Sequence, residues 1–304
     1  MANLSNSKFY PYGAAIFSML LWGMSFVWTA MALQYYEPVS IIFLRLTIST
    51  IFLFILLKLL GKFEKIQHAD IKLFVISALF NPFLYFIGEN YGVKLTSPTV
   101  SAVIIATIPL FAPIVAFFFL REKLSILNIS GMAISFLGIL IMLFTRSFSL
   151  EASPLGIAAL LFAVATAVGY SVFLKKLSSR YSPIFIIAVQ NLIGLIFFLP
   201  VFLVFDFSQF ITIRPNFEVI SSIVALAIFC SSIAFILFTI ATREIGVSKT
   251  NIFANLIPVF TGVFSFFIIG EELNSQKLLG ISLVVGGLFF AQIKKPLYFK
   301  HFSK

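Results

Sequence analysis

Residues 108–124, IPLFAPIVAFFFLREKL, recur 149 positions later as residues 257–273, IPVFTGVFSFFIIGEEL. Extended forward without a gap, the alignment has nine identical positions out of 31. Both copies carry glycines at matching places, Gly131 with Gly280 and Gly138 with Gly287. The chain is therefore predicted to consist of two related halves, residues 11–145 and 154–293.

The residues around these copies are overwhelmingly apolar. Of the 304 residues, 61% are hydrophobic, only 11% are charged, and 40 are phenylalanine. A soluble domain normally has about 25% charged residues, so this composition indicates a chain that lies mostly in lipid. The only cysteine, Cys230, falls in an apolar stretch, which excludes an intrachain disulfide and predicts a buried free thiol.

Apolar segments of membrane-spanning length fill most of the chain. A helix needs about 20 apolar residues to cross the hydrocarbon layer. Ten segments meet this requirement: 11–34, 38–60, 71–93, 97–120, 126–145, 155–175, 183–205, 218–241, 247–269 and 276–293. The predicted fold is an all-α integral membrane protein with ten transmembrane helices. Because each half has five spans, the halves should run in opposite directions, and such inverted repeats are typical of secondary transporters.

Basic residues predict the orientation of the spans. The chain has 21 Lys and Arg residues and a net charge of +10. Most of them lie at the N-terminus, in alternate connections and in the tail: Lys8, Lys58, Lys62, Lys65, Lys72, Arg121, Lys123, Lys175, Lys176, Arg180, Arg243, Lys249, Lys294, Lys295, Lys300 and Lys304. By the positive-inside rule, both termini should be cytoplasmic. The charge is thus explained by membrane topology and not by nucleic-acid binding. The first apolar run is longer than a signal-peptide core and is predicted to be a retained span.

Several motifs resemble those of a known transporter family. The first span reads LLWGMSFVW (residues 20–28), the second contains FLRLTIS (residues 43–49), and each half ends in a pattern of proline, acidic residue and glycines. In this order and doubled, the motifs resemble the drug/metabolite transporter superfamily, specifically bacterial ten-span proteins with two EamA domains. The sixth span, TAVGYSVFLKK (residues 166–176), departs from the pattern because it lacks the Trp-Gly pair. The resemblance implies export or exchange of a metabolite, often an amino acid, across the bacterial inner membrane, without implying one substrate.

Polar residues at membrane depth are the candidates for a substrate site, since they tend to face an interior cavity. Asn81, Tyr85 and Glu89 are spaced four residues apart and should share one helical face. Glu89 could bind a substrate ammonium group or a coupling proton. Alternatively, it could pair with Lys94 near the interface.

Arg45 lies inside the second predicted span. Its guanidinium could bind a substrate carboxylate. It could instead have a structural role, pairing with Glu89 or reaching the outer interface. If Arg45 and Glu89 do pair, opening and closing of the pair could form an outer gate.

Four further predicted spans add candidate residues. Trp22 and Ser25 share a face of the first span, and Asn251 and Asn255 lie one turn apart in the ninth. Tyr170 in the sixth span is a further candidate for substrate binding, with Gln190 and Asn191 in the seventh ranked after it.

Two prolines at matching positions of the halves are predicted hinges. Pro109 and Pro258 would each kink a span and free a backbone carbonyl four residues earlier. Three acidic residues at span ends, Glu122, Glu271 and Glu272, are interpreted as solvated charges and not as site residues.

Signals for an enzyme are weak. The chain has two histidines, His68 and His301, which fall in a loop and in the tail, and it has no P-loop pattern. No cofactor and no metal site are predicted. The sequence predicts a secondary carrier that works by alternating access, driven by a proton gradient or by the substrate's own gradient. The expected partners are a small-molecule substrate and the lipid bilayer. A lipid or lipid-linked-sugar flippase and a membrane-embedded enzyme are the alternatives, and the choice between monomer and homodimer stays open.

Overall fold

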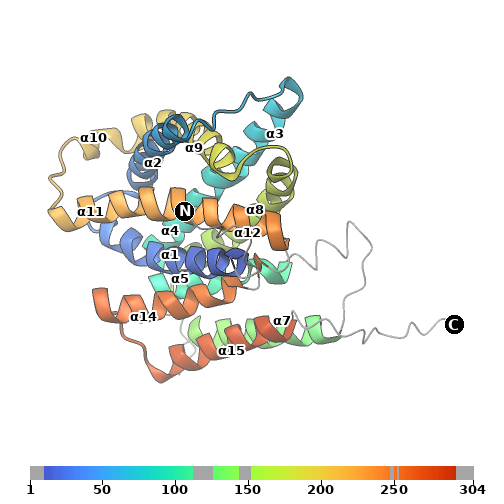
Figure 1. Ribbon diagram of the computed structural model, residues 1–304. Helices are drawn as coiled ribbons and strands as arrows, with labels where there is room; N and C mark the ends of the chain where they lie inside the picture. The colour runs from blue at the N-terminus through green and yellow to red at the C-terminus, as the bar shows by residue number, and fades with distance from the viewer. Residues whose placement is uncertain (1–9, 112–125, 144–151, 247–249, 252, 292–304) are drawn as a thin grey trace.

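The computed structural model describes residues 10–111, 126–143, 152–246, 250–251 and 253–291. Its elements in chain order are α1 (Tyr10–Ala32), α2 (Pro38–Leu60), α3 (His68–Ala78), η2 (Leu79–Leu84), α4 (Tyr85–Leu95), α5 (Pro98–Ile105), α7 (Ile126–Leu143), α8 (Pro154–Ser178), α9 (Pro183–Phe205), α10 (Phe207–Phe210), α11 (Phe217–Ala225), η3 (Leu226–Ala234), α12 (Phe235–Ile245), η4 (Phe253–Leu256), α14 (Ile257–Ile269) and α15 (Ser275–Ala291). All the regular elements in these ranges are helical, as Figure 1 shows.

Six helical segments are long and apolar enough to cross a membrane: Tyr10–Ala32, Pro38–Leu60, His68–Leu95, Pro154–Ser178, Pro183–Phe205 and Phe217–Ile245. Four shorter apolar helices cover Pro98–Phe111, Ile129–Met142, Phe253–Ile269 and Ser275–Phe290. The prediction of an all-helical, multi-pass membrane protein is confirmed. The count of ten spans and the inverted orientation of the halves stay predictions.

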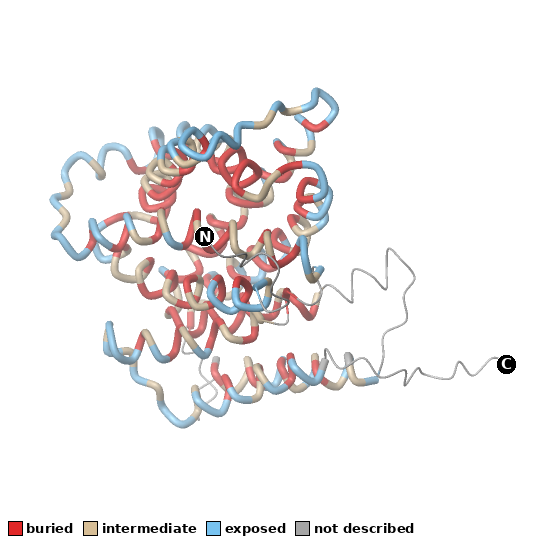
Figure 2. Tube along the Cα trace, viewed as in Figure 1, coloured by how far each residue is buried: buried red, intermediate tan, exposed pale blue. Residues whose placement is uncertain are grey.

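Burial follows the pattern expected of helices surrounded by lipid. Buried residues face the interior of the helical assembly, and exposed ones cover its outside (Figure 2). Many of the exposed side chains are large and apolar, for example Phe217 at 82% and Phe267 at 77%. Such exposure would be unfavourable in water but matches the hydrocarbon of a bilayer.

Two of the long helical segments contain a turn wider than an α-helix. In the segment His68–Leu95 the break is η2, where Asn81 has φ −147° and ψ 120°. A residue before proline is pushed out of the α region, and Pro82 follows Asn81. In the segment Phe217–Ile245 the wide turn is η3, where the helix continues and Ser232 donates from its hydroxyl to the Ala227 carbonyl five residues back. Wide turns of this kind occur frequently at functional sites.

Helices α2 and α9 pack against each other, and a carboxylate caps the start of each. Asp206, after α9, accepts hydrogen bonds from the Ser40 amide (2.8 Å) and hydroxyl (3.0 Å) near the start of α2. Glu64, after α2, accepts one from the Ser182 amide (2.9 Å) at the start of α9. A carboxylate at a helix N-terminus satisfies free amides and interacts favourably with the helix dipole. The two caps fix the register of this pair.

Helices α7 and α15 lie side by side (Figure 1), and glycines allow their close approach. A Cβ atom added to Gly280 would lie 2.8 Å from the Gly138 carbonyl oxygen, and one added to Gly287 would lie 2.7 Å from that of Gly131. A Cβ atom added to the neighbouring Gly286 would meet no atom within 4 Å. The close contact thus depends on one glycine of that adjacent pair.

Candidate functional site

A pocket lies among the helices. Its lining comes from both halves of the chain: Trp22, Ser25, Phe26, Arg45, Asn81, Tyr85, Phe86, Glu89, Ile105, Ile108, Ala167, Tyr170, Ser171, Phe235, Phe238, Asn251, Ala254 and Ile257. Seven of the eight residues predicted to bind substrate are in this set, and so is Arg45.

Arg45 is held in the pocket wall by a small number of contacts. Its side chain is 2% exposed, and its Nε donates to the Ser231 hydroxyl at 2.8 Å. The Phe86 ring lies beneath the guanidinium, with Cζ 4.1 Å from the ring centroid. The Nη1 atom lies 3.9 Å from Glu89 Oε2, a distance too long for a hydrogen bond, and has no hydrogen-bond partner among the described residues. A buried guanidinium therefore has donor capacity left over.

Glu89 faces Arg45, as one of the sequence interpretations predicts. Its Oε1 accepts a hydrogen bond from the Tyr85 hydroxyl at 2.9 Å. Pairing with Lys94 was the alternative and is wrong, because Lys94 forms its ion pair with Glu37. Asn81, Tyr85 and Glu89 do not share one regular helical face, because η2 breaks the helix at Asn81. All three still line the pocket.

A chain of hydrogen bonds continues from Arg45 away from Glu89. Asn191 donates to the Ser49 hydroxyl (2.7 Å) and to the Ser231 carbonyl (3.1 Å). The hydroxyls of Ser49 and Ser232 lie 2.6 Å apart. These residues join α2, α9 and the wide turn η3. The network holds the backbone of Ser231, the residue whose hydroxyl accepts from Arg45 Nε.

Aromatic rings form another part of the wall. Trp22 packs against Phe235 and Phe238, with ring centroids 4.9 Å and 5.0 Å apart. Opposite charges beside an aromatic surface suit a ligand that has both polar and apolar parts.

The packing around Gly23 explains why a glycine follows the tryptophan in the Trp-Gly motif. A Cβ atom at this position would lie 2.6 Å from the Cβ of Phe260 and 3.2 Å from the Thr261 amide nitrogen in α14. The Thr261 hydroxyl donates to the Gly23 carbonyl at 2.9 Å. The motif therefore places an aromatic side chain in the pocket and lets α14 contact the α1 backbone at the next residue.

The two asparagines of the predicted ninth span occupy different places. Asn251 lines the pocket. Asn255 is fully buried and is not among the lining residues, and neither polar atom of its amide has a hydrogen-bond partner in the described part of the chain. The structure thus separates Asn255 from the pocket.

The two prolines follow breaks in the helices and do not kink continuous ones. Helix α5 ends at Ile105, and Pro109 comes after the turn at residues 106–107. Pro258 lies in the first turn of α14, directly after the 3-10 segment η4. A proline in a first helical turn has no intrahelical bond to lose. The prediction of kinks inside spans is therefore corrected to interruptions beside the pocket, which Ile105, Ala254 and Ile257 line.

Tyr170 reaches the pocket from α8 and belongs to a second polar chain. Its hydroxyl donates to Gln190 Oε1 at 3.1 Å, and Gln190 Nε2 donates to the Ser77 hydroxyl at 2.6 Å. Gln190 and Asn191 thus support lining or positioning residues and do not line the pocket themselves.

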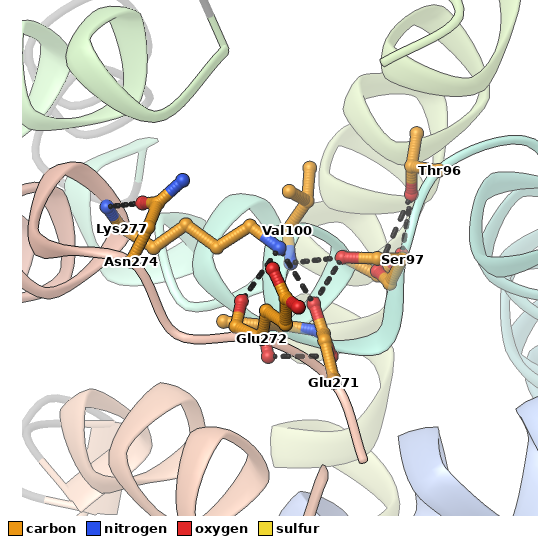
Figure 3. A network of polar contacts seen from close by, with 9 residues as sticks. Thr96, Ser97, Val100, Glu271, Glu272, Asn274 and Lys277 are labelled. Carbon is orange, nitrogen blue, oxygen red and sulfur yellow. Dashed lines mark hydrogen bonds and ion pairs between the residues drawn. The ribbon is translucent and has the colours of Figure 1, made fainter. Parts of the chain in front are cut away.

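One acidic residue was misjudged from the sequence. Glu271 was interpreted as a solvated charge, but its side chain is only 9% exposed and contacts residues of the other half (Figure 3). Glu272 is exposed, in agreement with that interpretation, and Glu122 lies outside the described residues.

Ser231 and most of the aromatic wall were not predicted from the sequence. Ser231 and Ser232 are adjacent hydroxyls in an apolar span, and that pattern could have marked them. Phe86, Phe235 and Phe238 carry no distinguishing signal among 40 phenylalanines.

Comparison with known proteins agrees with this structure. The transporter YetK of Bacillus subtilis, named as uncharacterized, is 28% identical over 256 residues, which are 83% of this chain and 77% of YetK. An uncharacterized transporter of Archaeoglobus fulgidus is 26% identical over 278 residues, covering 91% of this chain and 97% of its own. A solved structure described only as the crystal structure of a protein has the same fold, with a TM-score of 0.69 at 18% identity, over 92% of this chain and 97% of the other.

The model of the EamA-like transporter family matches residues 10–144 and again residues 154–292. These two matches cover most of the chain. The protein is a multi-pass membrane transporter and not an enzyme, and it belongs to the EamA-like transporter family.

Proposed function

We propose that the protein is a secondary carrier that binds a small metabolite in the pocket and moves it by alternating access. The observation that carries the proposal is the Arg45–Glu89 pair, buried in the pocket wall at 3.9 Å. Ionised residues at membrane depth are expensive and mark substrate or ion pathways. The lining comes from both halves of the chain, which is the arrangement expected of a carrier with a midplane site.

The substrate class we propose is an amino acid or a related compound. Arg45 Nη1 has no hydrogen-bond partner among the described residues, and Glu89 Oε2 is not held by Tyr85, which bonds the other oxygen. A ligand with a carboxylate and an ammonium group could bind both and separate the pair. The rings of Trp22 and Phe238 would then contact an apolar side chain.

We further propose the arrangement in the membrane. Ten spans in two inverted halves, residues 11–145 and 154–293, would place both termini in the cytoplasm of a bacterial cell, with the protein in the inner membrane. The shorter apolar helices support the count of ten, because they occupy the positions of the remaining four spans. The expected direction is export, with a proton gradient or the substrate's own gradient as the driving force.

The test is an untargeted comparison of metabolites inside and outside cells that overproduce the protein. Arg45→Gln and Glu89→Gln remove one charge of the pair each, and Lys94→Gln is the control because Lys94 lies in an exposed ion pair. A metabolite that accumulates outside with the parent and with Lys94→Gln, but not with the other two variants, would identify the substrate and establish export. Equal pools for all four proteins would contradict the proposal and direct the search to lipid flipping.

A further inference from the structure

Glu271 connects the two halves of the chain at one end of the helical assembly. It follows α14, and its carboxylate reaches the start of α5 (Figure 3). Oε1 accepts from the Ser97 hydroxyl at 2.7 Å, and Oε2 accepts from the Thr99 hydroxyl at 2.8 Å and from the Thr99 amide at 3.4 Å. Lys277 Nζ lies 3.3 Å from Oε1. Both carboxylate oxygens are therefore engaged.

The two helices that Glu271 joins are both interrupted beside the pocket. Helix α5 has eight residues and ends at Ile105, which lines the pocket, and α14 starts at Ile257, which also lines it. Ser97 lies eight residues before Ile105, or about 12 Å away along a helix at 1.5 Å per residue. Each helix thus has a backbone break at the pocket and its opposite end at Glu271. Segments attached through such breaks can swing without bending a regular helix.

Two other carboxylates join neighbouring elements at the same end of the helical assembly. Glu37 pairs with Lys94, and Asp206 caps the start of α2. The Glu271 contact differs from these two in its position. It joins α5 and α14, and both of these helices are interrupted beside the pocket and contribute to its wall. The long helices α2 and α9 have no such break next to the pocket.

We propose that Glu271 is a latch that closes the pocket at this end, and that its bonds to Ser97 and Thr99 must break before α5 and α14 can separate. The proposal rests on the alternating access proposed above. A hydrogen bond to a charged group contributes enough to shift an equilibrium about tenfold or more. Removing the charge of Glu271 should therefore increase the population that is open at this end.

The test measures access to the pocket and needs no substrate. Cys230→Ser removes the only cysteine, and Ser25→Cys then places a reporter thiol in the pocket wall. A separate variant, Asn274→Cys, has its thiol at an exposed position of the α14–α15 connection. Its labelling identifies the face of the membrane on which Glu271 lies. A membrane-impermeant maleimide is added to sealed vesicles of either orientation, and the labelling rate of Ser25→Cys is measured.

We expect Glu271→Gln to raise labelling from the Asn274 face about tenfold. Glu272→Gln is the matched control, because the neighbouring carboxylate is exposed, and it should leave the rate unchanged. The double variant Ser97→Ala/Thr99→Ala removes the hydroxyl partners and should act in the same direction as Glu271→Gln. If Glu271→Gln does not reach the membrane, the labelling rate of this double variant tests the proposal in its place.

Labelling of Glu271→Gln and of the double variant at the rate of Glu272→Gln would overturn the latch. This result is distinguishable from failure of the carrier proposal, which is judged by metabolite release from cells with native Glu271. Unchanged labelling with intact release would remove the latch alone. Faster labelling without any release would keep the latch as a closure of the pocket and remove the proposed substrate.

Discussion

At the scale of single residues, Arg45 is a buried cation with an incomplete set of partners. Ser231 fixes its Nε, Phe86 covers one face of the guanidinium, and Glu89 stays at 3.9 Å. A fully bonded Arg–carboxylate pair would leave nothing for a ligand, and a buried charge without any partner would be too unfavourable. The observed geometry lies between these two situations, as a binding site requires.

Ser231→Ala tests whether this positioning matters. The substitution removes the hydrogen bond to Arg45 Nε but keeps the charge pair and the fold of η3. Because a hydrogen bond to a charged group is worth about 1.5–3 kcal/mol, release of the metabolite identified above should fall about tenfold or more. Ser282→Ala, at an exposed position of α15, is the control. Equal release by both variants would show that Ser231 has no role in positioning Arg45.

The contact between Arg45 and Glu89 could be predicted because both are ionisable residues in apolar segments, where unpaired charges are rare. The role of Ser231 could not, since its hydroxyl meets Arg45 through a wide turn that regular helical spacing does not describe. Glu271 was misinterpreted for a related reason. An acidic residue after a span looks solvated in the sequence, and only the packing of α5 against α14 reveals Ser97 and Thr99 as its partners.

At the scale of elements, interruptions of helices position the site. The break at η2, the wide turn η3, the turn at residues 106–107 and the 3-10 segment η4 all lie in segments that contribute pocket residues or hold Arg45. The prolines Pro109 and Pro258 were predicted as features of two of these segments. A proline can kink a continuous helix or follow the end of an interrupted one, and the turn before the proline decides which of the two occurs. The sequence contained no pattern that marks these turns.

Close helix contacts are the second feature at this scale, and Gly23 allows a direct test. Gly23→Ala would force its Cβ to within 2.6 Å of the Phe260 Cβ, an atom tied to the α14 backbone. Overpacking of this kind usually destabilises by about 1–3 kcal/mol, so the melting temperature of the purified protein should fall. Gly13→Ala in the same helix meets no atom within 4 Å and should not lower it. Equal melting of the two variants would contradict the close approach of α1 and α14.

At the scale of the whole molecule, the chain combines apolar outer surfaces with an interior that holds charges, hydroxyls and amides. Exposed phenylalanines face outward, while Arg45 and Glu89 are buried between elements of both halves. The sequence predicted this division well, because apolar composition and doubled motifs extend over the whole chain. The identity of the pocket wall depended on how ten apolar segments pack, which hydropathy alone does not determine.

The most direct test of the central claim is counterflow in proteoliposomes. Vesicles containing the purified protein are loaded with the metabolite identified in cells and diluted into a trace of the same compound carrying an isotope label. If the protein is an alternating-access carrier, the concentration of label inside the vesicles should rise transiently above the concentration outside. Glu89→Gln should abolish this accumulation. If the label only reaches equal concentrations inside and outside, with the parent protein and with Glu89→Gln alike, transport by alternating access is contradicted.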